Sequence, residues 1–227
     1  MSQPLLSPEE LTALAHGVGD GTIATDTGVN TEASVVSYDL ARDHSTTTIN
    51  TVAIDLLMDR MARQLRIGLQ TSLRSESTVE TRVSEIKPYG QFIATLKAPI
   101  SINILRLLPL RGLSLLVIEP EIIFVALDRF FGGPGRGIKE IPDGRLFTAT
   151  EHRIIKKMVE VILGCLREAW APVIQMHCEA VGSEAQPQFA QITDDKDLVL
   201  ITPLVVQIAD TSSVIQLVYP LEGMKPI

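Results

Sequence analysis

Residues 150–171, TEHRIIKKMVEVILGCLREAWA, carry the clearest structural signal in the chain. Their apolar side chains recur every three or four positions, which is the spacing of one helix face. A second stretch, roughly residues 48–73, shows the same pattern about 100 residues earlier. The two stretches predict long amphipathic helices. The apolar faces are formed by Ile154, Ile155, Met158, Ile162, Cys165, Leu166 and Ala169 in one helix, and by Ile49, Val52, Ala53, Leu56, Leu57 and Leu65 in the other.

Each predicted helix is followed by three segments rich in aliphatic and β-branched residues, which are typical of strands. Glu119-Pro120 and Tyr219-Pro220 follow the third segment of each half, 100 residues apart. The first of these prolines is expected to open a helix over roughly Pro120–Phe131. The expected strands are Val79–Ile86, Ile100–Leu105 and Leu113–Ile118 in the first half, and Ile174–Val181, Leu198–Ile208 and Val214–Val218 in the second.

This repeat predicts an α/β fold with approximate two-fold symmetry, built from a duplicated α-β-β-β unit. Because no helix separates the strands within a unit, antiparallel pairing is expected within each half. The two long helices should cover one or both faces of a shared sheet. The body of the protein is expected to span residues 36–227.

The 227 residues are 45% hydrophobic and 21% charged, which suits one large domain or two small ones. The most apolar stretch, Leu113–Phe131, is interrupted by charged residues and a proline, so no membrane span is expected. The N-terminus lacks the basic and apolar regions of a signal peptide. Two cysteines, Cys165 and Cys178, are too few for a disulfide framework, which favours a reduced cytoplasmic compartment.

The net charge of −7 is unevenly distributed along the chain. Residues 1–35 contain five acids and no Lys or Arg, so the remainder is almost neutral. No basic stripe dominates, and aromatic residues make up only 4% of the chain. A nucleic-acid partner is therefore not expected.

Residues 1–35 are expected to form an appendage to the body. Ser7 suits an N-cap, with Pro8 at the first helical position and Glu10 at the third, and a small apolar face comes next. Residues 19–34 have the composition of a flexible linker. Because so short a helix is marginal alone in water, it either docks on the body, waits for a partner, or is a tail without a role.

Enzyme signatures are absent from the sequence, which has no phosphate-binding loop, zinc-protease motif or nucleophile elbow. His177 and Cys178 are adjacent, which is not the spacing of a zinc site. Asp194, Asp195 and Asp197 resemble a carboxylate site, but they also suit a polar turn between strands, which is favoured. No metal or other cofactor is expected.

The most unusual segment is FFGGPGRG, residues 130–137. It follows a predicted helix, whereas a phosphate-binding loop follows a strand and opens a helix. Gly132 alone would satisfy a helix C-cap. The remaining glycines have no such explanation, and they suit close approach of the backbone by another protein.

Eight short stretches, which occur in the same order, resemble the FliM family of flagellar motor switch proteins. They are Leu6–Leu14, Tyr38–Arg42, Arg63–Arg66, Pro109–Gly112, Phe131–Gly135, Phe147–Glu151, Glu168–Val173 and Gln188–Ala190.

The resemblance implies that the body is the middle domain of that family, an α/β/α fold shared with the chemotaxis phosphatases CheC and CheX. It implies that the glycine segment contacts the rotor protein FliG, through Phe131, Gly132, Gly133, Pro134, Gly135 and Arg136. It implies that the N-terminal segment docks phosphorylated CheY, through Leu6, Ser7, Glu9, Glu10, Leu11 and Leu14. Neighbouring copies would form the cytoplasmic ring of the flagellar basal body, peripheral to the inner membrane.

The sequence departs from the family pattern in two ways. In the docking peptide, Pro8, Thr12 and Ala15 stand where Gln, Asp and Leu are more usual, and Ala15 gives up about 1–2 kcal/mol of burial on binding. The chain also stops near the junction with the FliN-like domain that usually comes next, at Ile227. Reduced contact with FliN is therefore expected.

A CheC-like phosphatase is the alternative function from a different class. Those enzymes use a Glu and an Asn, three residues apart, on their long helices. The comparable pairs are Asp59 with Ala62 and Glu160 with Leu163, and neither contains the amide that orients water. A non-catalytic adaptor is therefore favoured, and a small-molecule site lacks any convergent polar cluster.

Overall fold

The computed structural model describes residues 51–138, 141–142 and 144–224. The predicted docking peptide, the linker and the start of the body therefore lie outside the described residues. The helices are α2 (Thr51–Leu73), α3 (Tyr89–Thr95), α4 (Pro120–Phe130) and α5 (Ala149–Trp170), with short 3-10 turns η2 (Pro187–Phe189) and η3 (Leu221–Met224). The strands are β1 (Ser77–Thr81), β2 (Glu85–Pro88), β3 (Ser101–Leu108), β4 (Ser114–Ile118), β5 (His177–Glu184), β6 (Leu198–Ile208) and β7 (Thr211–Pro220).

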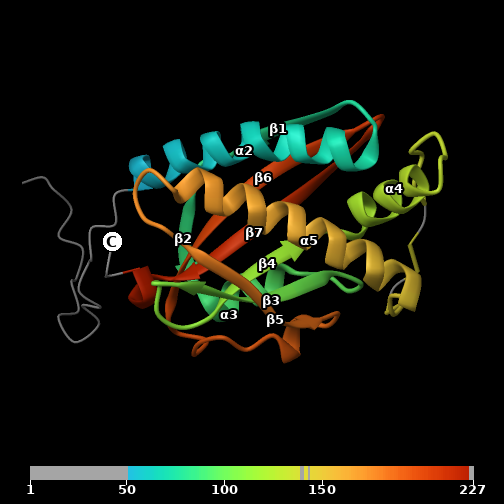
Figure 1. Cartoon of the computed structure of the whole chain (residues 1–227). Coiled ribbons are helices and arrows are strands. Elements are labelled where there is room, and N and C mark those ends of the chain that lie inside the picture. The colour runs from blue at the N-terminus through green and yellow to red at the C-terminus, as the bar shows by residue number, and fades with distance from the viewer. Residues whose placement is uncertain (1–50, 139–140, 143, 225–227) are drawn as a thin grey trace, which may run out of the picture. The chain divides into compact units, whose positions relative to one another are not determined.

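One sheet contains all seven strands of the described residues, in the order β1-β6-β7-β4-β3-β5. β2 pairs with β6 beside β1, and every pairing is antiparallel. The long helices α2 and α5 lie next to each other across one face of the sheet (Figure 1). The prediction that both helices cover a shared sheet is confirmed, and both occupy the same face.

The sheet order shows the predicted two-fold symmetry, with one difference in pairing. Exchanging β1, β6 and β7 for β5, β3 and β4 reproduces the order, and the β4–β7 pair lies at the centre. Antiparallel pairing within each half is confirmed for β3–β4 and β6–β7.

The expected pairing is wrong for the first strand of each half, because β1 pairs with β6 and β5 pairs with β3. Each first strand follows its own helix after a short connection and reaches the outer edge of the sheet. The neighbouring strand at that edge belongs to the other half, so the two units exchange strands.

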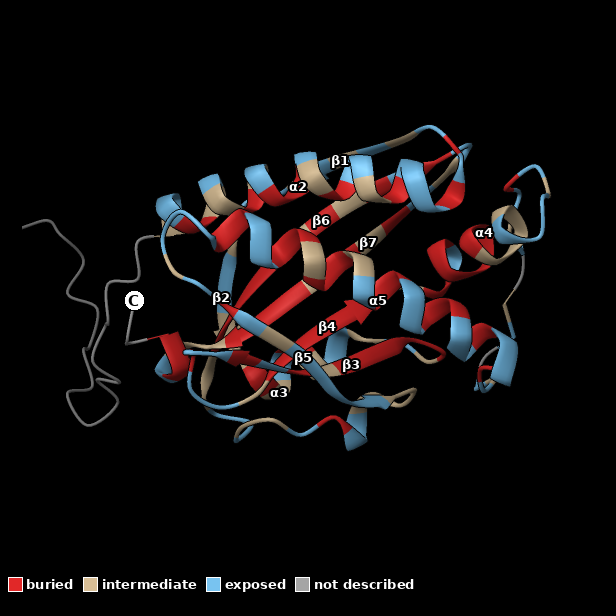
Figure 2. Cartoon of the chain, in the orientation of Figure 1, coloured by how far each residue is buried: buried red, intermediate tan, exposed pale blue. Residues whose placement is uncertain are grey.

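Alternating side chains of the central strands divide the interior into two apolar layers, as a period of two requires. Leu116 and Ile118 of β4 pack towards α2, α4 and α5, whereas Leu115 and Val117 face the layer that includes Tyr89 and Phe92 of α3. Figure 2 shows the buried residues along the central strands and on the sheet-facing sides of the helices. The helices thus form layers on both faces of the sheet.

Most predicted elements have the expected positions, but the predicted apolar face of α2 is wrong. Val52 and Leu56 are 66% and 65% exposed, and the sheet-facing side is formed instead by Ile54, Met58, Met61, Ala62, Leu65, Leu69 and Leu73.

Two further features differ from the prediction. The predicted strand over residues 79–86 is broken into β1 and β2, and Val83 between them is 77% exposed. Helix α3 was not predicted, because it is only seven residues long and contains Gly90. No helix in the described ranges is long and apolar enough to cross a membrane.

Candidate functional site: the glycine loop after α4

Helix α4 positions the glycine segment, and its own start is fixed to the sheet. Pro120 occupies the first turn, where its missing N–H costs nothing. The carboxylate of Glu119 accepts hydrogen bonds from the backbone N–H of Val214 (2.6 Å) and the hydroxyl of Ser213 (3.1 Å) on β7. Because residues 122–126 are also buried, the helix is a rigid support for the segment at its C-terminal end.

Gly132 ends α4 in the way that the C-cap interpretation predicts. Its φ of +84° lies in the left-handed region, which residues with a side chain rarely adopt. Its N–H donates to the carbonyl of Arg129 at 3.0 Å, and the N–H of Phe131 donates to the carbonyls of Leu127 and Asp128. The helix therefore stops at a fixed point, and the chain turns into an exposed loop.

The carboxylate of Asp128 holds the next part of the loop, which we call the glycine loop (residues 131–137). Asp128 Oδ2 accepts hydrogen bonds from the backbone N–H groups of Gly135 (2.7 Å) and Arg136 (3.0 Å). The backbone carbonyl of the same residue accepts from the N–H of Gly133 at 2.8 Å. Three backbone N–H groups of the loop are thus satisfied by one residue of the preceding helix.

The glycine loop exposes both backbone and apolar side-chain surface. The Phe131 side chain is 74% exposed. Gly132, Pro134 and Arg136 are exposed as well, and Gly133 is half-buried. Gly135 is buried, with a φ of +79°, and a Cβ there would overlap Nε of Arg129. The segment predicted for close backbone approach is therefore accessible on one side and supported on the other.

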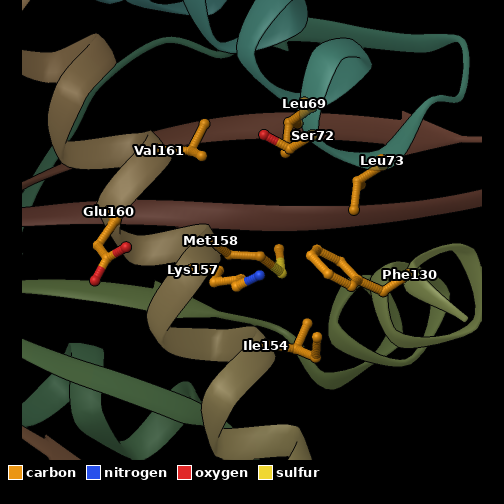
Figure 3. Close-up of a pocket in the computed structure, with 9 residues that line it drawn as sticks. All are labelled: Leu69, Ser72, Leu73, Phe130, Ile154, Lys157, Met158, Glu160 and Val161. Carbon is orange, nitrogen blue, oxygen red and sulfur yellow. The ribbon is translucent and has the colours of Figure 1, made fainter.

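Phe130, the last residue of α4, lies just before the glycine loop. Together with residues of α2 and α5 it lines a hollow of about 450 Å³ (Figure 3). The Nζ atom of Lys157 on α5 lies 4.4 Å from the centroid of the Phe130 ring, which is a cation–π contact. The rest of the lining comes mainly from apolar side chains, among them Leu69, Leu73, Ile154, Met158 and Val161. Sequence reasoning missed this hollow because its residues come from three separate helices.

A capping box and an ion pair fix the start of α5, and both involve the buried residue Glu151. The Thr148 hydroxyl accepts from the N–H of Glu151, whose carboxylate accepts from the N–H of Thr148 (2.6 Å), forming a capping box. Arg145 pairs with the same carboxylate, and its guanidinium lies 5.0 Å from the centroid of the Phe124 ring on α4. Arg145 therefore contacts both Glu151 at the start of α5 and Phe124 on α4.

The other residues that the sequence analysis singled out are not part of the glycine loop. Leu6, Ser7, Glu9, Glu10, Leu11 and Leu14 lie outside the described residues. The acidic segment forms a turn, in which the carboxylate of Asp197 accepts hydrogen bonds from the Thr193 hydroxyl and the N–H of Asp194. No group of three or more His, Cys, Asp or Glu among the residues that the structure describes could hold a metal ion.

The positions comparable to a phosphatase pair contain two carboxylates and two apolar side chains. Asp59 on α2 accepts a hydrogen bond from the Thr81 hydroxyl of β1, and Ala62 is buried. On α5, Glu160 lies at the hollow and Leu163 is buried. Neither helix presents the Glu and Asn pair at these positions.

Together, the strand-exchanged sheet, the paired long helices and the supported loop define a mixed α/β domain with an exposed glycine loop. The family model described as "Flagellar motor switch protein FliM" matches residues 48–227. The FliM of Pseudomonas aeruginosa is 32% identical over 225 residues, which cover 99% of this chain and 69% of that protein. The chain belongs to the FliM family of flagellar motor switch proteins, which are switch components and not enzymes.

Solved structures show the same fold. The FliM middle domain of Vibrio alginolyticus matches with a TM-score of 0.69 and 28% identity, over 76% of this chain and 96% of that one. A FliM chain from a Helicobacter pylori FliG–FliM complex matches with a TM-score of 0.72 and 24% identity, over 77% and 94% of the two chains. The predicted fold class is therefore confirmed for the described residues.

Proposed function

We propose that this protein is a non-catalytic adaptor of the flagellar switch that binds FliG through the glycine loop. The contact residues are Phe131, Gly132, Gly133, Pro134, Gly135 and Arg136. The observation that carries the proposal is a loop that is exposed on one side and fixed from below by Asp128. The relative in the H. pylori FliG–FliM complex supports FliG as the partner.

The chemistry of the loop suits a protein partner. Burying the exposed ring of Phe131 would stabilise a complex by about 1.5–3 kcal/mol. Gly132 is exposed and a Cβ there would meet no atom of this protein, so another backbone can approach it without a side chain between the two. Because the loop is already held by hydrogen bonds, less conformational entropy is lost on binding than for a free loop.

We infer a second contact, in which residues 1–35 capture phosphorylated CheY through Leu6, Ser7, Glu9, Glu10, Leu11 and Leu14. This proposal rests on the resemblance of residues 6–14 to the docking peptide of the FliM family, and the capping pattern of the segment agrees with it. A captured regulator is tethered near the body of residues 36–227, which raises its effective concentration there. The captured regulator shifts the switch between its two rotational states only to the extent that it binds one state more tightly than the other.

The place of the protein in the cell is part of the same proposal. Copies would assemble side by side in the ring at the cytoplasmic face of the flagellar basal body, peripheral to the inner membrane. FliN would be a further partner, mainly through the domain that usually comes next in the family.

Calorimetric titration with the middle domain of FliG tests the rotor contact. Gly133→Asp should abolish or strongly weaken binding, because it adds a bulky carboxylate beside that of Asp128. Gly164→Asp is the matched control, since it adds the same charge on α5 where the nearest atom to a new Cβ lies 4.0 Å away. Equal binding by the native protein and both variants would place the contact outside the loop.

A further inference from the structure

At the base of the glycine loop, the carboxyl group of Asp128 fills the space that a side chain on residue 133 would need. A Cβ built on Gly133 would overlap Asp128 Oδ1, although Gly133 does not have a left-handed φ. Its φ therefore does not exclude a side chain, and the three atoms nearest to such a Cβ all belong to the Asp128 carboxyl group. Gly132 and Gly135 differ in this respect, because both have a positive φ.

We infer that Asp128 is the positioning residue of the FliG contact, and that it is the reason why residue 133 must be glycine. Oδ2 fixes Gly135 and Arg136 by hydrogen bonds, while Oδ1 lies against Gly133. This inference rests on the proposed function for its effect on affinity. Its effect on loop geometry is independent of any partner.

The neighbouring residue supports the same arrangement. Nε of Arg129 is buried without a hydrogen-bond partner in the described structure, directly beneath Gly135. Two consecutive side chains of α4 thus contact the same short stretch of the loop, because Asp128 contacts Gly133, Gly135 and Arg136 and Arg129 lies against Gly135. The end of a rigid helix therefore dictates the conformation of the surface that would meet the partner.

A double-mutant cycle, measured as affinity for the FliG middle domain, distinguishes two reasons for a glycine at residue 133. Either a side chain there would clash with Asp128, or it would clash with the partner. Asp128→Ala should weaken binding about tenfold or more, equivalent to about 1.4 kcal/mol, because charge-assisted hydrogen bonds to two loop amides are lost. Gly133→Ala should weaken it similarly in the native background. In the Asp128→Ala background, Gly133→Ala should cost less than about twofold, since its Cβ no longer overlaps a carboxylate.

Two further variants show whether the carboxylate acts through its acceptor oxygen. Asp128→Asn keeps one oxygen that can accept from Gly135 and Arg136, so it should recover much of the affinity that Asp128→Ala loses. Glu121→Ala removes a carboxylate from the exposed first turn of the same helix and should leave binding unchanged. A Gly133→Ala penalty of equal size in both backgrounds would overturn the inference, because the partner itself would then require the glycine.

Amide exchange in the free protein distinguishes failure of this inference from failure of the proposed function. The amides of Gly135 and Arg136 should exchange faster in Asp128→Ala than in the native protein or Asp128→Asn, while those of α5 stay unchanged. If the native protein does not bind FliG but this pattern appears, the positioning role stands and the FliG proposal fails. Unchanged exchange at both amides in Asp128→Ala would refute the positioning role.

Discussion

At the scale of single residues, carboxylates at the end of α4 and at the start of α5 hold nearby parts of the chain in place. The carboxylate of Asp128 satisfies two loop amides, and Glu151 satisfies Thr148 and Arg145 at the start of α5. Both carboxylates are thus used for structure, although a search for catalytic acids would consider them. The thiols are similarly structural, because Cys165 is buried on α5 and Cys178 is partly buried on β5.

Burial raises the pKa of both thiols to about 11, with Glu168 adding to the rise at Cys165 and Arg167 opposing it at Cys178. The reactive thiolate is therefore scarce at pH 8. We expect both cysteines to react with a disulfide reagent at least tenfold more slowly in the native protein than in the urea-unfolded chain, with the native rate rising towards pH 10. A native rate equal to the unfolded rate at pH 8 would contradict the buried placement.

At the scale of elements, the two long helices approach closely at one point. A Cβ on Gly68 of α2 would lie 2.8 Å from Cγ1 of Val161 on α5, whereas one on Gly164 of α5 has room. Helix propensity favours Ala over Gly equally at both positions. The packing of the helix pair therefore decides which glycine can be replaced.

Gly164→Ala should stabilise the protein by about 0.5–1 kcal/mol, the usual gain for a helical glycine. Gly68→Ala should be neutral or destabilising, because overpacking costs about 1–3 kcal/mol and offsets that gain. Urea unfolding followed by circular dichroism measures both. Equal stabilisation by the two substitutions would mean that the helices do not meet at Gly68, and Gly68→Ala with Val161→Ala checks the pair directly.

Local sequence patterns predicted the elements well where the pattern was continuous. The bounds of β6 were predicted as Leu198–Ile208, and α4 ends one residue before the expected Phe131. The strand exchange could not be predicted, because pairing between β1 and β6 depends on segments more than 100 residues apart. The support of the loop by Asp128 was also missed, since a carboxylate that binds backbone amides leaves no recognisable spacing.

At the scale of the whole molecule, the two proposed contacts use different parts of the sequence. The proposed FliG contact is the glycine loop, which is supported by α4, and the proposed CheY contact lies in residues 1–35. The proposal therefore predicts that each contact can be removed without the other.

Deleting residues 1–16 should abolish capture of phosphorylated CheY and leave the affinity for the FliG middle domain within about twofold. The physical reason is that the predicted apolar face for the regulator is lost while the support of the loop remains. Calorimetric titration of the shortened protein with each partner measures both effects. Retained capture of the regulator would refute the docking role of the segment.

Mapping FliG directly onto the surface is the most decisive measurement. Isotope-labelled protein titrated with the unlabelled FliG middle domain should show its largest amide shift changes at residues 131–137 and at the adjoining end of α4. The amides of β5, at the edge of the sheet, serve as the internal reference and should stay unchanged. Shift changes concentrated away from the glycine loop, with the loop amides unaffected, would contradict the proposed rotor contact.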